Sequence, residues 1–173
     1  YMYVDGVHLG EKGKKNWLQD DYVKFIRLAE LIINSSGTGI LAFISNHSFL
    51  DNPTFRGMRN SLLNSFSKFS AIDLHGNTKK KEVSPDGSKD ENVFDIQQGV
   101  AIGLFRKPPD RSNENQVLHY DLWGERGDAF IQANHGKYGW LLKHDCTSTP
   151  WAKLFSSPPF FFFIPEDLGL REE

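Results

Sequence analysis

A chain of 173 residues, of which 39% are hydrophobic and 24% charged, has room for one folded core, so wholesale disorder is excluded. Its formal net charge of -2 excludes a generally polybasic nucleic-acid binder but allows a local basic patch. The single cysteine, Cys146, excludes an internal disulfide and a zinc site built from several thiolates, which suits a reducing cytoplasm. No apolar run reaches membrane-spanning length and no signal peptide is recognisable, so we expect no membrane partner.

The first regular element that the sequence predicts is a helix over residues 20–33, preceded by an N-terminal arm or loop at residues 1–19. Asp20 and Asp21 supply an N-cap and negative charge in the first turn, and glycines at 37 and 39 end the helix. Apolar residues at helical spacing predict one buried face, made by Tyr22, Phe25 or Ile26, Ala29, and Ile32 or Ile33.

A strand–helix–strand unit follows. Residues 40–44 are apolar on both faces, which is typical of a central parallel strand covered by helices. Asn52 and Pro53 form an N-cap pair that opens a helix, and residues 69–74 form the second strand. We expect Arg56 and Arg59 to face solvent, while the inward side of the helix carries Phe55, Met58, Leu62, Leu63 and Phe66.

A polar loop, residues 76–91, separates this unit from the last strands of the region. We expect nothing in it to be buried, and a loop of this length in a compact domain is usually functional or disordered. Two apolar stretches within residues 93–105 flank Gln97, Gln98 and Gly99, which predicts a bulged or bent strand pair. Beyond residue 107 the sequence predicts a strand at 117–122, a short helix at 138–143 and a strand at 160–164.

The order of these elements is typical of the second half of a nucleotide-binding α/β domain. We therefore predict an α/β fold with parallel strands and helices, followed by an antiparallel edge strand pair. The predicted divisions are an arm at 1–19, the half-domain at 20–107, and a linker with the start of a following domain at 108–173. The strands at 40–44 and 69–74 should be parallel neighbours or near neighbours, with residues 100–105 antiparallel in the same sheet.

Several stretches of this sequence also match a known family. They are DDYVKFIR at 20–27, GILAFISNHSFLD at 39–51, FRGMRNSLL at 55–63, IDLHGN at 72–77, DGSKDENVFDIQQG at 86–99 and HYDLWG at 119–124. As a set they make the chain similar to the C-terminal half of the catalytic domain of adenine-N6 DNA methyltransferases, closest to the type IIG and type ISP restriction–modification enzymes. The glycine-rich loop and the Asn-Pro-Pro-Tyr motif of that family do not occur in this sequence.

The resemblance implies a partial Rossmann-like methyltransferase sheet and a parent enzyme that methylates the N6 amine of adenine in double-stranded DNA. It implies S-adenosylmethionine as the cofactor, with none of its main binding residues in this chain. It also implies that the chain alone is inactive, that the following domain is a specificity domain, and that the parent is cytoplasmic, in a bacterium or archaeon. The partners would be DNA and the missing N-terminal half, and apolar groups exposed where that half belongs would favour homo-oligomers.

The family pattern matches Phe94 to the aromatic residue that stacks on the extruded target base. The alternative is that Phe94 packs in the core beside Val93 and Ile96. Because some relatives differ in offset by about one residue, Ile96 or Val93 is a further candidate for a place near the pocket.

Asn46 and Ser48 follow a predicted strand at its C-terminal end, where open α/β sheets bind ligands, so they are candidates for lining the target or cofactor pocket. The alternative is that they only cap the turn before the next helix. We interpret His47 and His75 as surface or hydrogen-bonded histidines rather than catalytic bases, because transfer from a sulfonium needs no strong base. The histidines show no recognised ligand spacing, so we expect no metal site.

The candidate DNA-binding residues lie in or beside the polar loop, where they would contact phosphates without reading sequence. They are Lys79, Lys80, Lys81, Lys89, Gln97 and Gln98. The alternative is a solvated loop whose lysines are offset by neighbouring carboxylates.

Two other functions stay open at the level of sequence. The chain could be a non-catalytic module that binds DNA or a partner, or a remnant of such an enzyme. A generic α/β enzyme unrelated to DNA is weaker, because it would explain the motif series only by chance.

Overall fold

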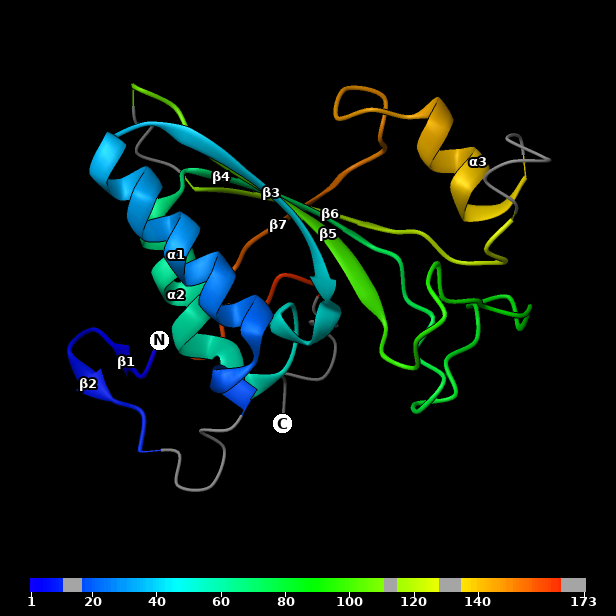
Figure 1. Cartoon of the computed structure of the whole chain (residues 1–173), viewed down its shortest axis with the longest axis horizontal. Coiled ribbons are helices and arrows are strands. Elements are labelled where there is room, and N and C mark those ends of the chain that lie inside the picture. The colour runs from blue at the N-terminus through cyan, green and yellow to red at the C-terminus, as the bar shows by residue number, and fades with distance from the viewer. Residues whose placement is uncertain (11–16, 111–114, 128–134, 166–173) are drawn as a thin grey trace.

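The computed structural model describes residues 1–10, 17–110, 115–127 and 135–165, and its centre is a five-stranded mixed sheet (Figure 1). The strands lie in the order β3-β5-β4-β6-β7, and α1 and α2 lie together on one side of the sheet. None of the described helices combines the length and apolar character needed to cross a membrane.

The N-terminal part contains a small hairpin that the sequence analysis did not predict. Strands β1 (Tyr3–Val4) and β2 (Val7–His8) pair antiparallel around Asp5 and Gly6, which both have positive φ. An Asp-Gly pair suits such a tight hairpin turn. Residues 11–16 of the predicted arm lie outside the described residues, and a short 3₁₀ turn η1 (Trp17–Gln19) then leads into α1 (Asp21–Ser36).

The predicted strand–helix–strand unit is present. It consists of β3 (Gly39–Asn46), the 3₁₀ turns η2 (His47–Phe49) and η3 (Pro53–Phe55), α2 (Arg56–Ser65) and β4 (Lys68–Asp73). The carboxamide of Asn52 accepts the Thr54 amide, and Pro53 follows, so this N-cap pair acts as predicted.

The remaining strands complete the sheet. Strand β5 (Val100–Lys107) lies between β3 and β4 and is antiparallel to both, so β3 and β4 are parallel near neighbours, as predicted. Strand β6 (Gln116–Asp121) is parallel to β4, and β7 (Ala152–Leu154) is antiparallel to β6. This mixed sheet with its helices confirms the partial Rossmann-like α/β class.

One detail of that prediction is wrong, because the antiparallel element is a single interior strand rather than an edge pair. Residues 93–99 form no strand; several of their backbone groups bond to side chains, as in the contacts of Asn92 and Arg126 with Phe94. Strands β6 and β7 belong to the same sheet although they come from the C-terminal part, and the domain division at residue 107 stays a prediction.

Alternation along β4 and β5 divides the core between the two faces of the sheet. Phe69, Ala71, Ala101 and Phe105 face α1 and α2, in one cluster with Ile26 and other buried residues of these helices. The opposite face forms a smaller cluster in which α3 (Gly136–Lys143) takes part; it contains Leu74, Val93, Val100 and Leu122, with Ile72, Ile102, Tyr138 and Trp140 packed on it.

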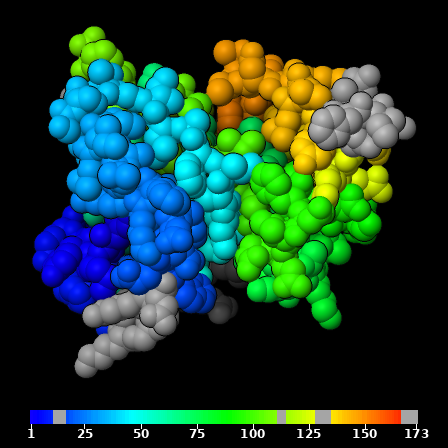
Figure 2. Space-filling view, viewed as in Figure 1, coloured from blue at the N-terminus to red at the C-terminus, as the bar shows by residue number. Residues whose placement is uncertain are grey.

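The sequence analysis placed β3 too centrally. Within the described residues β3 has a neighbour on one side only, and its residues alternate in exposure, with Ile40 68% exposed. The outer side of α1 is also apolar: Phe25 and Ile32 are exposed, while Val23, Ile26, Glu30 and Ile33 are buried. Figure 2 shows the cyan residues of β3 open to the surface between the blue helix and the green loop.

Arg59 is buried, not solvent-facing as predicted. Its exposed fraction is 0%, and its guanidinium donates to the carbonyl oxygens of Phe49, Asn52 and Phe160 at 2.7–2.9 Å. Burial lowers the pKa of Arg59 to about 10. The five donors of a guanidinium satisfy carbonyl groups of the irregular segments around α2, which periodicity cannot reveal.

Two further corrections concern irregular segments. Residues 160–164 enter the core, with Phe163 fully buried, but form a turn in which Phe161 has a φ of 55° rather than a strand. The polar loop also has buried members, Asn77 and Ser84. Asn77 is hydrogen-bonded within the loop: its side-chain oxygen accepts from the backbone N–H of Lys80, and its backbone N–H donates to the Glu82 carboxylate.

Glu30 joins the two helices through a buried carboxylate. It accepts hydrogen bonds from Ser61 and Ser65 of α2 at 2.8 and 2.7 Å, and from Arg27 and the Tyr1 hydroxyl at 2.8 and 2.9 Å. Burial acts to raise the pKa of Glu30, but these four donors outweigh it and hold the pKa below its ordinary value of 4.5.

We expect Glu30→Gln to lower the free energy of unfolding by about 1–3 kcal/mol at neutral pH. The folded-state pKa is depressed, so the stabilisation is complete above pH 4.5 and is lost as the pH falls through the folded pKa. Urea denaturation of the wild type and of Glu30→Gln between pH 7 and pH 3 should show that the difference in their free energies of unfolding becomes smaller as the pH falls. The control is Asp21→Asn on the same helix, whose exposed pair with Lys24 is worth at most about 0.5 kcal/mol; equal losses in both variants would contradict the role given to Glu30.

Candidate functional site

The candidate residues from the sequence lie at one end of the sheet, where β3, β4 and β6 finish. The C-terminal ends of β3, β4 and β6 meet there with the N-terminal end of β5, because β5 runs opposite to its two neighbours. The connection from β4 to β5, residues 74–99, leaves and re-enters the sheet at this end; we call it the β4–β5 loop (Figure 1, green).

Phe94 lies on the outer part of the β4–β5 loop with 42% of its surface exposed. Its neighbour Val93 is buried in the smaller core cluster, whereas Ile96 is 46% exposed. Phe94 therefore does not pack in the core in the way the alternative interpretation required. A hollow of about 610 Å³ adjoins it, lined also by Thr78, Lys89, Asn92, Ile96, Gln97 and Arg126.

Two polar side chains fix the backbone around Phe94. Asn92 accepts the Phe94 amide at 2.9 Å and donates to the carbonyls of Gly76 and Gln98 at 3.1 and 2.6 Å. Arg126 donates to the carbonyls of Asn92 and Phe94 at 2.6 and 3.1 Å. The ring of Phe94 is thus carried by a loop whose backbone is fixed by hydrogen bonds both before and after Phe94.

A buried ion pair holds the base of the same loop. Lys137 of α3 and Asp90 each have fully buried side chains, and their charged atoms lie 2.7 Å apart. The ammonium group also donates to the carbonyls of Leu74 and Glu91 at 2.6 Å, and Asp90 accepts the amides of Gly76 and Gly124. Burial lowers the pKa of Lys137, against the opposing effect of Asp90.

Sequence reasoning missed Asn92, Arg126, Asp90 and Lys137. Asp90 was counted only among the carboxylates that offset the loop lysines, and Lys137 adjoins a short helix for which no role was expected. Their signal is spatial: Arg126 and Lys137 satisfy backbone groups of the loop from a distant part of the chain, and Asp90 and Asn92 do so from other positions within the loop.

Asn46 and Ser48 lie beside the re-entry of the β4–β5 loop. Asn46 pairs with Val100 in the sheet, and the His47 amide donates to the Gly99 carbonyl at 3.0 Å. The Asn46 side chain accepts the Ser48 amide at 2.8 Å, so it does cap the turn. A role of these residues in a pocket stays a prediction.

The candidate DNA-binding residues all lie on the surface. Lys79, Lys80 and Lys81 are exposed in one turn, Gln97 and Gln98 are exposed beyond Phe94, and Lys89 is ion-paired with Glu91 at 2.6 Å. Lys80 approaches Asp51 at 4.0 Å. Lys89 and Gln97 line the hollow beside Phe94, whereas Lys80 lines a second cavity with His47 and His75; contact of the six residues with DNA stays a prediction.

His47 and His75 are hydrogen-bonded, as interpreted from sequence, but they are buried. His47 Nδ1 lies 3.0 Å from Asp73 Oδ1, and His75 Nε2 lies 2.9 Å from Asp121 Oδ1, which also contacts His119 Nε2 at 3.0 Å. Burial opposes a charged His47, yet the hydrogen bond and charge of Asp73 outweigh it and raise the pKa of His47. Together with Asp73 these histidines place three ligand-type side chains next to one another, which the sequence analysis did not expect.

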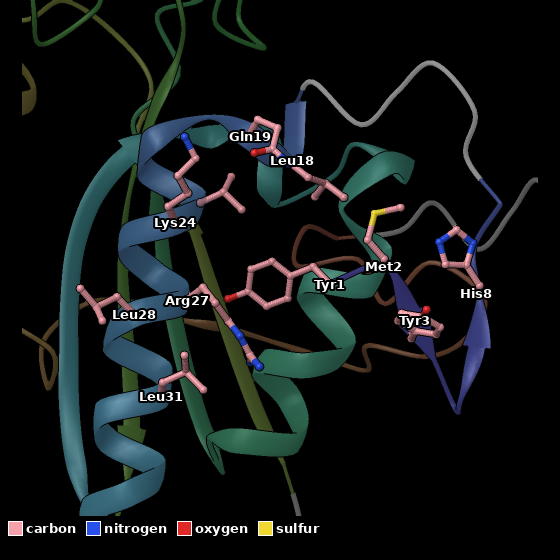
Figure 3. A pocket seen from close by; sticks show the side chains of 11 residues that line it. Tyr1, Met2, Tyr3, His8, Leu18, Gln19, Lys24, Arg27, Leu28 and Leu31 are labelled. Carbon is pink, nitrogen blue, oxygen red and sulfur yellow. The ribbon is translucent and has the colours of Figure 1, made fainter.

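The apolar side expected where another part of the domain belongs is present along β3 and α1. Its exposed residues are Phe25, Leu28, Leu31, Ile32, Ile40 and Ile44. Leu28 and Leu31 also line a hollow of about 570 Å³ between α1 and the N-terminal hairpin, which contributes Met2, Tyr3 and His8 (Figure 3). None of the residues lining this hollow belongs to the β4–β5 loop, so it is distinct from the candidate site.

We expect Lys137→Met to lower the free energy of unfolding by about 3–5 kcal/mol, because it leaves Asp90 buried without its cation. Amides of the β4–β5 loop, including those of Gly76 and Phe94, should exchange with solvent faster than in the wild type. Chemical denaturation and hydrogen exchange measure the two effects.

The matched control is Lys89→Met in the same loop, whose solvent-exposed pair with Glu91 should contribute little to the free energy of unfolding. Unchanged exchange of the loop amides in Lys137→Met would show that the ion pair does not hold the loop.

Comparison with known proteins gives matches among solved structures. No protein-family model matches the chain, and no curated protein matches it. The cryo-EM structure of a DrdV–DNA complex shows 26% identity and a TM-score of 0.63, and it covers 82% of this chain and 13% of its own chain. The ATP-dependent type ISP restriction–modification enzyme LlaBIII bound to DNA shows 33% identity and a TM-score of 0.55, over 66% of this chain and 8% of its own.

A third structure extends the likeness of fold. It is a nuclease-deletion mutant of the type ISP restriction–modification enzyme LlaGI with a DNA substrate mimic, with a TM-score of 0.66 at 23% identity, covering 82% of this chain and 13% of its own. The chain therefore spans only a small part of the length of the proteins it matches. These similarities relate it to restriction–modification enzymes.

Proposed function

We propose that this chain supplies the target-base half of the catalytic domain of an adenine-N6 DNA methyltransferase within a restriction–modification enzyme. The intact enzyme transfers a methyl group from S-adenosylmethionine to the N6 amine of an adenine in double-stranded DNA. The similarity to restriction–modification enzymes and to proteins bound to DNA supports this proposal, as does the mixed sheet with its antiparallel interior strand.

The observation that carries the proposal is the half-exposed Phe94 on an anchored loop beside a hollow. A base must leave the duplex before its exocyclic amine can be methylated, and an extruded base is held by stacking on aromatic side chains. An exposed aromatic ring is useful for stacking only if its backbone is fixed beforehand, and Asn92 and Arg126 provide that fixation.

The surrounding residues suit the other requirements of such a site. Lys79, Lys80, Lys81 and Lys89 would contact phosphates around the extruded base, with Gln97 and Gln98 beside them. Asn46 and Ser48, next to Gly99, would line the pocket near the base. Methyl transfer from a sulfonium depends on alignment and on polarising the amine more than on a strong base, so no buried histidine is required as a base.

The residues present do not form a complete cofactor site. The sequence holds no glycine-rich strand–turn–helix, and in the described part of the chain the sheet ends at β3, with apolar side chains exposed along it. A further part of the same domain would continue the sheet beyond β3, cover the exposed side of α1 and hold the cofactor.

A second candidate function, a non-catalytic module that binds a partner or DNA, is favoured by the same unpaired apolar edge. An isolated chain with this edge would also associate with copies of itself. The two candidates differ in one respect, because only the methyltransferase requires Phe94 to act on an extruded adenine.

The experiment compares methyl transfer from labelled S-adenosylmethionine to DNA by the intact polypeptide that contains this sequence and by its Phe94→Ala variant. Loss of one stacking contact of about 1–3 kcal/mol predicts a 5- to 150-fold fall in kcat/KM. Phe94→Trp should restore most of the activity, and the chain alone should be inactive.

The matched control is Phe155→Ala, which removes a phenylalanine that is 86% exposed and remote in sequence from the β4–β5 loop; it should leave the rate unchanged. DNA binding without methylation of any adenine by the intact polypeptide would decide for the non-catalytic module. Equal rates for Phe94→Ala and the wild type would refute the stacking role.

A further inference from the structure

Three side chains of metal-ligand type converge below the β4–β5 loop. His47 follows β3 directly, Asp73 ends β4, and His75 lies two residues beyond it; all three are buried. One nitrogen or oxygen atom from each lies within 4.8 Å of those of the other two. Because the side chains come from the ends of two different strands, their sequence spacing gives no recognisable motif.

The distances suit a first coordination shell. Asp73 Oδ2 lies 3.2 Å from His47 Nδ1 and 3.8 Å from His75 Nδ1. Ligand atoms bound tetrahedrally at about 2.0–2.1 Å from Zn²⁺ lie roughly 3.3 Å from one another, which is close to the first of these distances, so His75 would have to move towards the other two ligands to close the shell. Without a metal, the His47–Asp73 hydrogen bond joins two of the three ligands.

The environment of His75 points to a ligand rather than to a simple hydrogen-bonded histidine. Its Nε2 lies 2.9 Å from Asp121 Oδ1, and a carboxylate can only accept, so Nε2 carries the proton in the neutral ring. In that tautomer the lone pair of Nδ1 is free on the side of the Asp73 carboxylate, whose Oδ2 lies 3.8 Å away. A metal cation between these two atoms would be bound by both.

The ring of His75 is also held in place. It stacks on Trp123 with centroids 3.3 Å apart, and Asp121 is itself contacted by His119 at 3.0 Å. A carboxylate on the outer nitrogen of a ligating histidine is the usual arrangement around a protein-bound metal, since it fixes both the tautomer and the ring orientation. His47 differs, because its Nε2 lies 3.5 Å from the donor Asn77 Nδ2, which suits a metal-free ring whose Nδ1–H faces Asp73; Nε2 would have to carry the proton once Nδ1 bound a metal.

A cavity of about 310 Å³ reaches the three side chains and leaves room for a water ligand at the open position. Its wall also carries the carboxylates of Asp51, Glu82 and Asp121, against the single lysine Lys80. The surplus of carboxylates favours a cation over an anion in this cavity.

We propose that His47, Asp73 and His75 form a site for one divalent transition-metal ion such as Zn²⁺, with water as the fourth ligand and Asp121 as the outer partner of His75. His47 packs so closely on Gly99 that a Cβ there would lie 2.5 Å from its ring, so a metal on His47 would join the ends of β3 and β4 to the loop. Two imidazoles and one carboxylate are a common ligand set for zinc.

The test uses the whole 173-residue chain, stripped of metal with a chelator. Calorimetric titration with Zn²⁺ should show one ion per chain, and Co²⁺ should give the strong visible absorption of a four-coordinate site. We expect His75→Ala and Asp73→Asn to weaken Zn²⁺ binding at least about 10-fold, and Asp121→Asn to weaken it by roughly 10–100-fold while keeping all three ligands. The melting temperature of the wild type should rise with added Zn²⁺.

The control is His135→Ala, which removes an exposed histidine paired with Glu125 outside the cluster and should bind Zn²⁺ as the wild type does. Circular dichroism of each metal-free variant establishes that it is folded. If His75→Ala or Asp73→Asn does not fold, the Zn²⁺ affinities of the Asp121→Asn and His75→Gln variants test the proposal in their place. Absence of Zn²⁺ binding by the wild type, or a Zn²⁺ affinity of the His75 and Asp73 variants equal to that of the wild type, would show that the cluster is only a hydrogen-bonded network.

Discussion

The antiparallel insertion of β5 between β3 and β4 is the constraint on which the arrangement of this molecule depends. A strand that returns beside β4 in the opposite direction must begin at the end of the sheet where β4 finishes. The whole β4–β5 loop is therefore confined to that end, and the end of β3 is brought against its final residues through the His47–Gly99 hydrogen bond. Phe94, the turn with Lys79, Lys80 and Lys81, and the buried His47 and His75 all lie at this end of the sheet for this topological reason.

Confinement alone does not give a long polar loop a single conformation, because its backbone groups need partners once they leave water. Here side chains from inside and outside the loop supply them. Lys137 and Arg126 reach in from the C-terminal part and bond to carbonyls up to and including that of Phe94, while Asn92 bonds to the carbonyl of Gln98 and Asp90 accepts amides from both parts. Burying Lys137 and Asp90 costs desolvation that a hydrophobic pair would avoid, so the ion pair contributes a defined loop position more than stability.

The sequence predicted the elements that local rules determine. The helix beginning near Asp21, the N-cap pair at Asn52 and Pro53 and the inward residues of α2 are as predicted, although the Asp20 side chain makes no capping hydrogen bond. These elements depend on spacing or capping within a few residues, whereas the antiparallel direction of β5, also as predicted, was expected from the whole sheet of the resembled family. The exposed apolar side along β3 was likewise expected, from the likeness to half of a larger domain.

Where the predictions failed, distant residues had changed the outcome. Arg59 was assigned to solvent because an arginine on an amphipathic helix usually lies there, but three carbonyls from irregular segments surround it. The placement of β3 at the centre of the sheet failed for a related reason, because a run of apolar residues cannot tell a strand covered by helices from one whose edge is bare within the described chain.

The histidine cluster shows the same limit most clearly, and it changes how the edge of the sheet is understood. His47 and Asp73 are separated by a helix and two turns in sequence, yet they are within hydrogen-bond distance because β3 and β4 end at the same edge. Whether a proton or a metal joins them, the contact fixes His47 against Gly99, and Gly99 begins the return of the loop into β5. The position of Phe94 is thus determined at two levels, by the hydrogen bonds of Asn92 and Arg126 around it and by a buried polar cluster at the root of the loop.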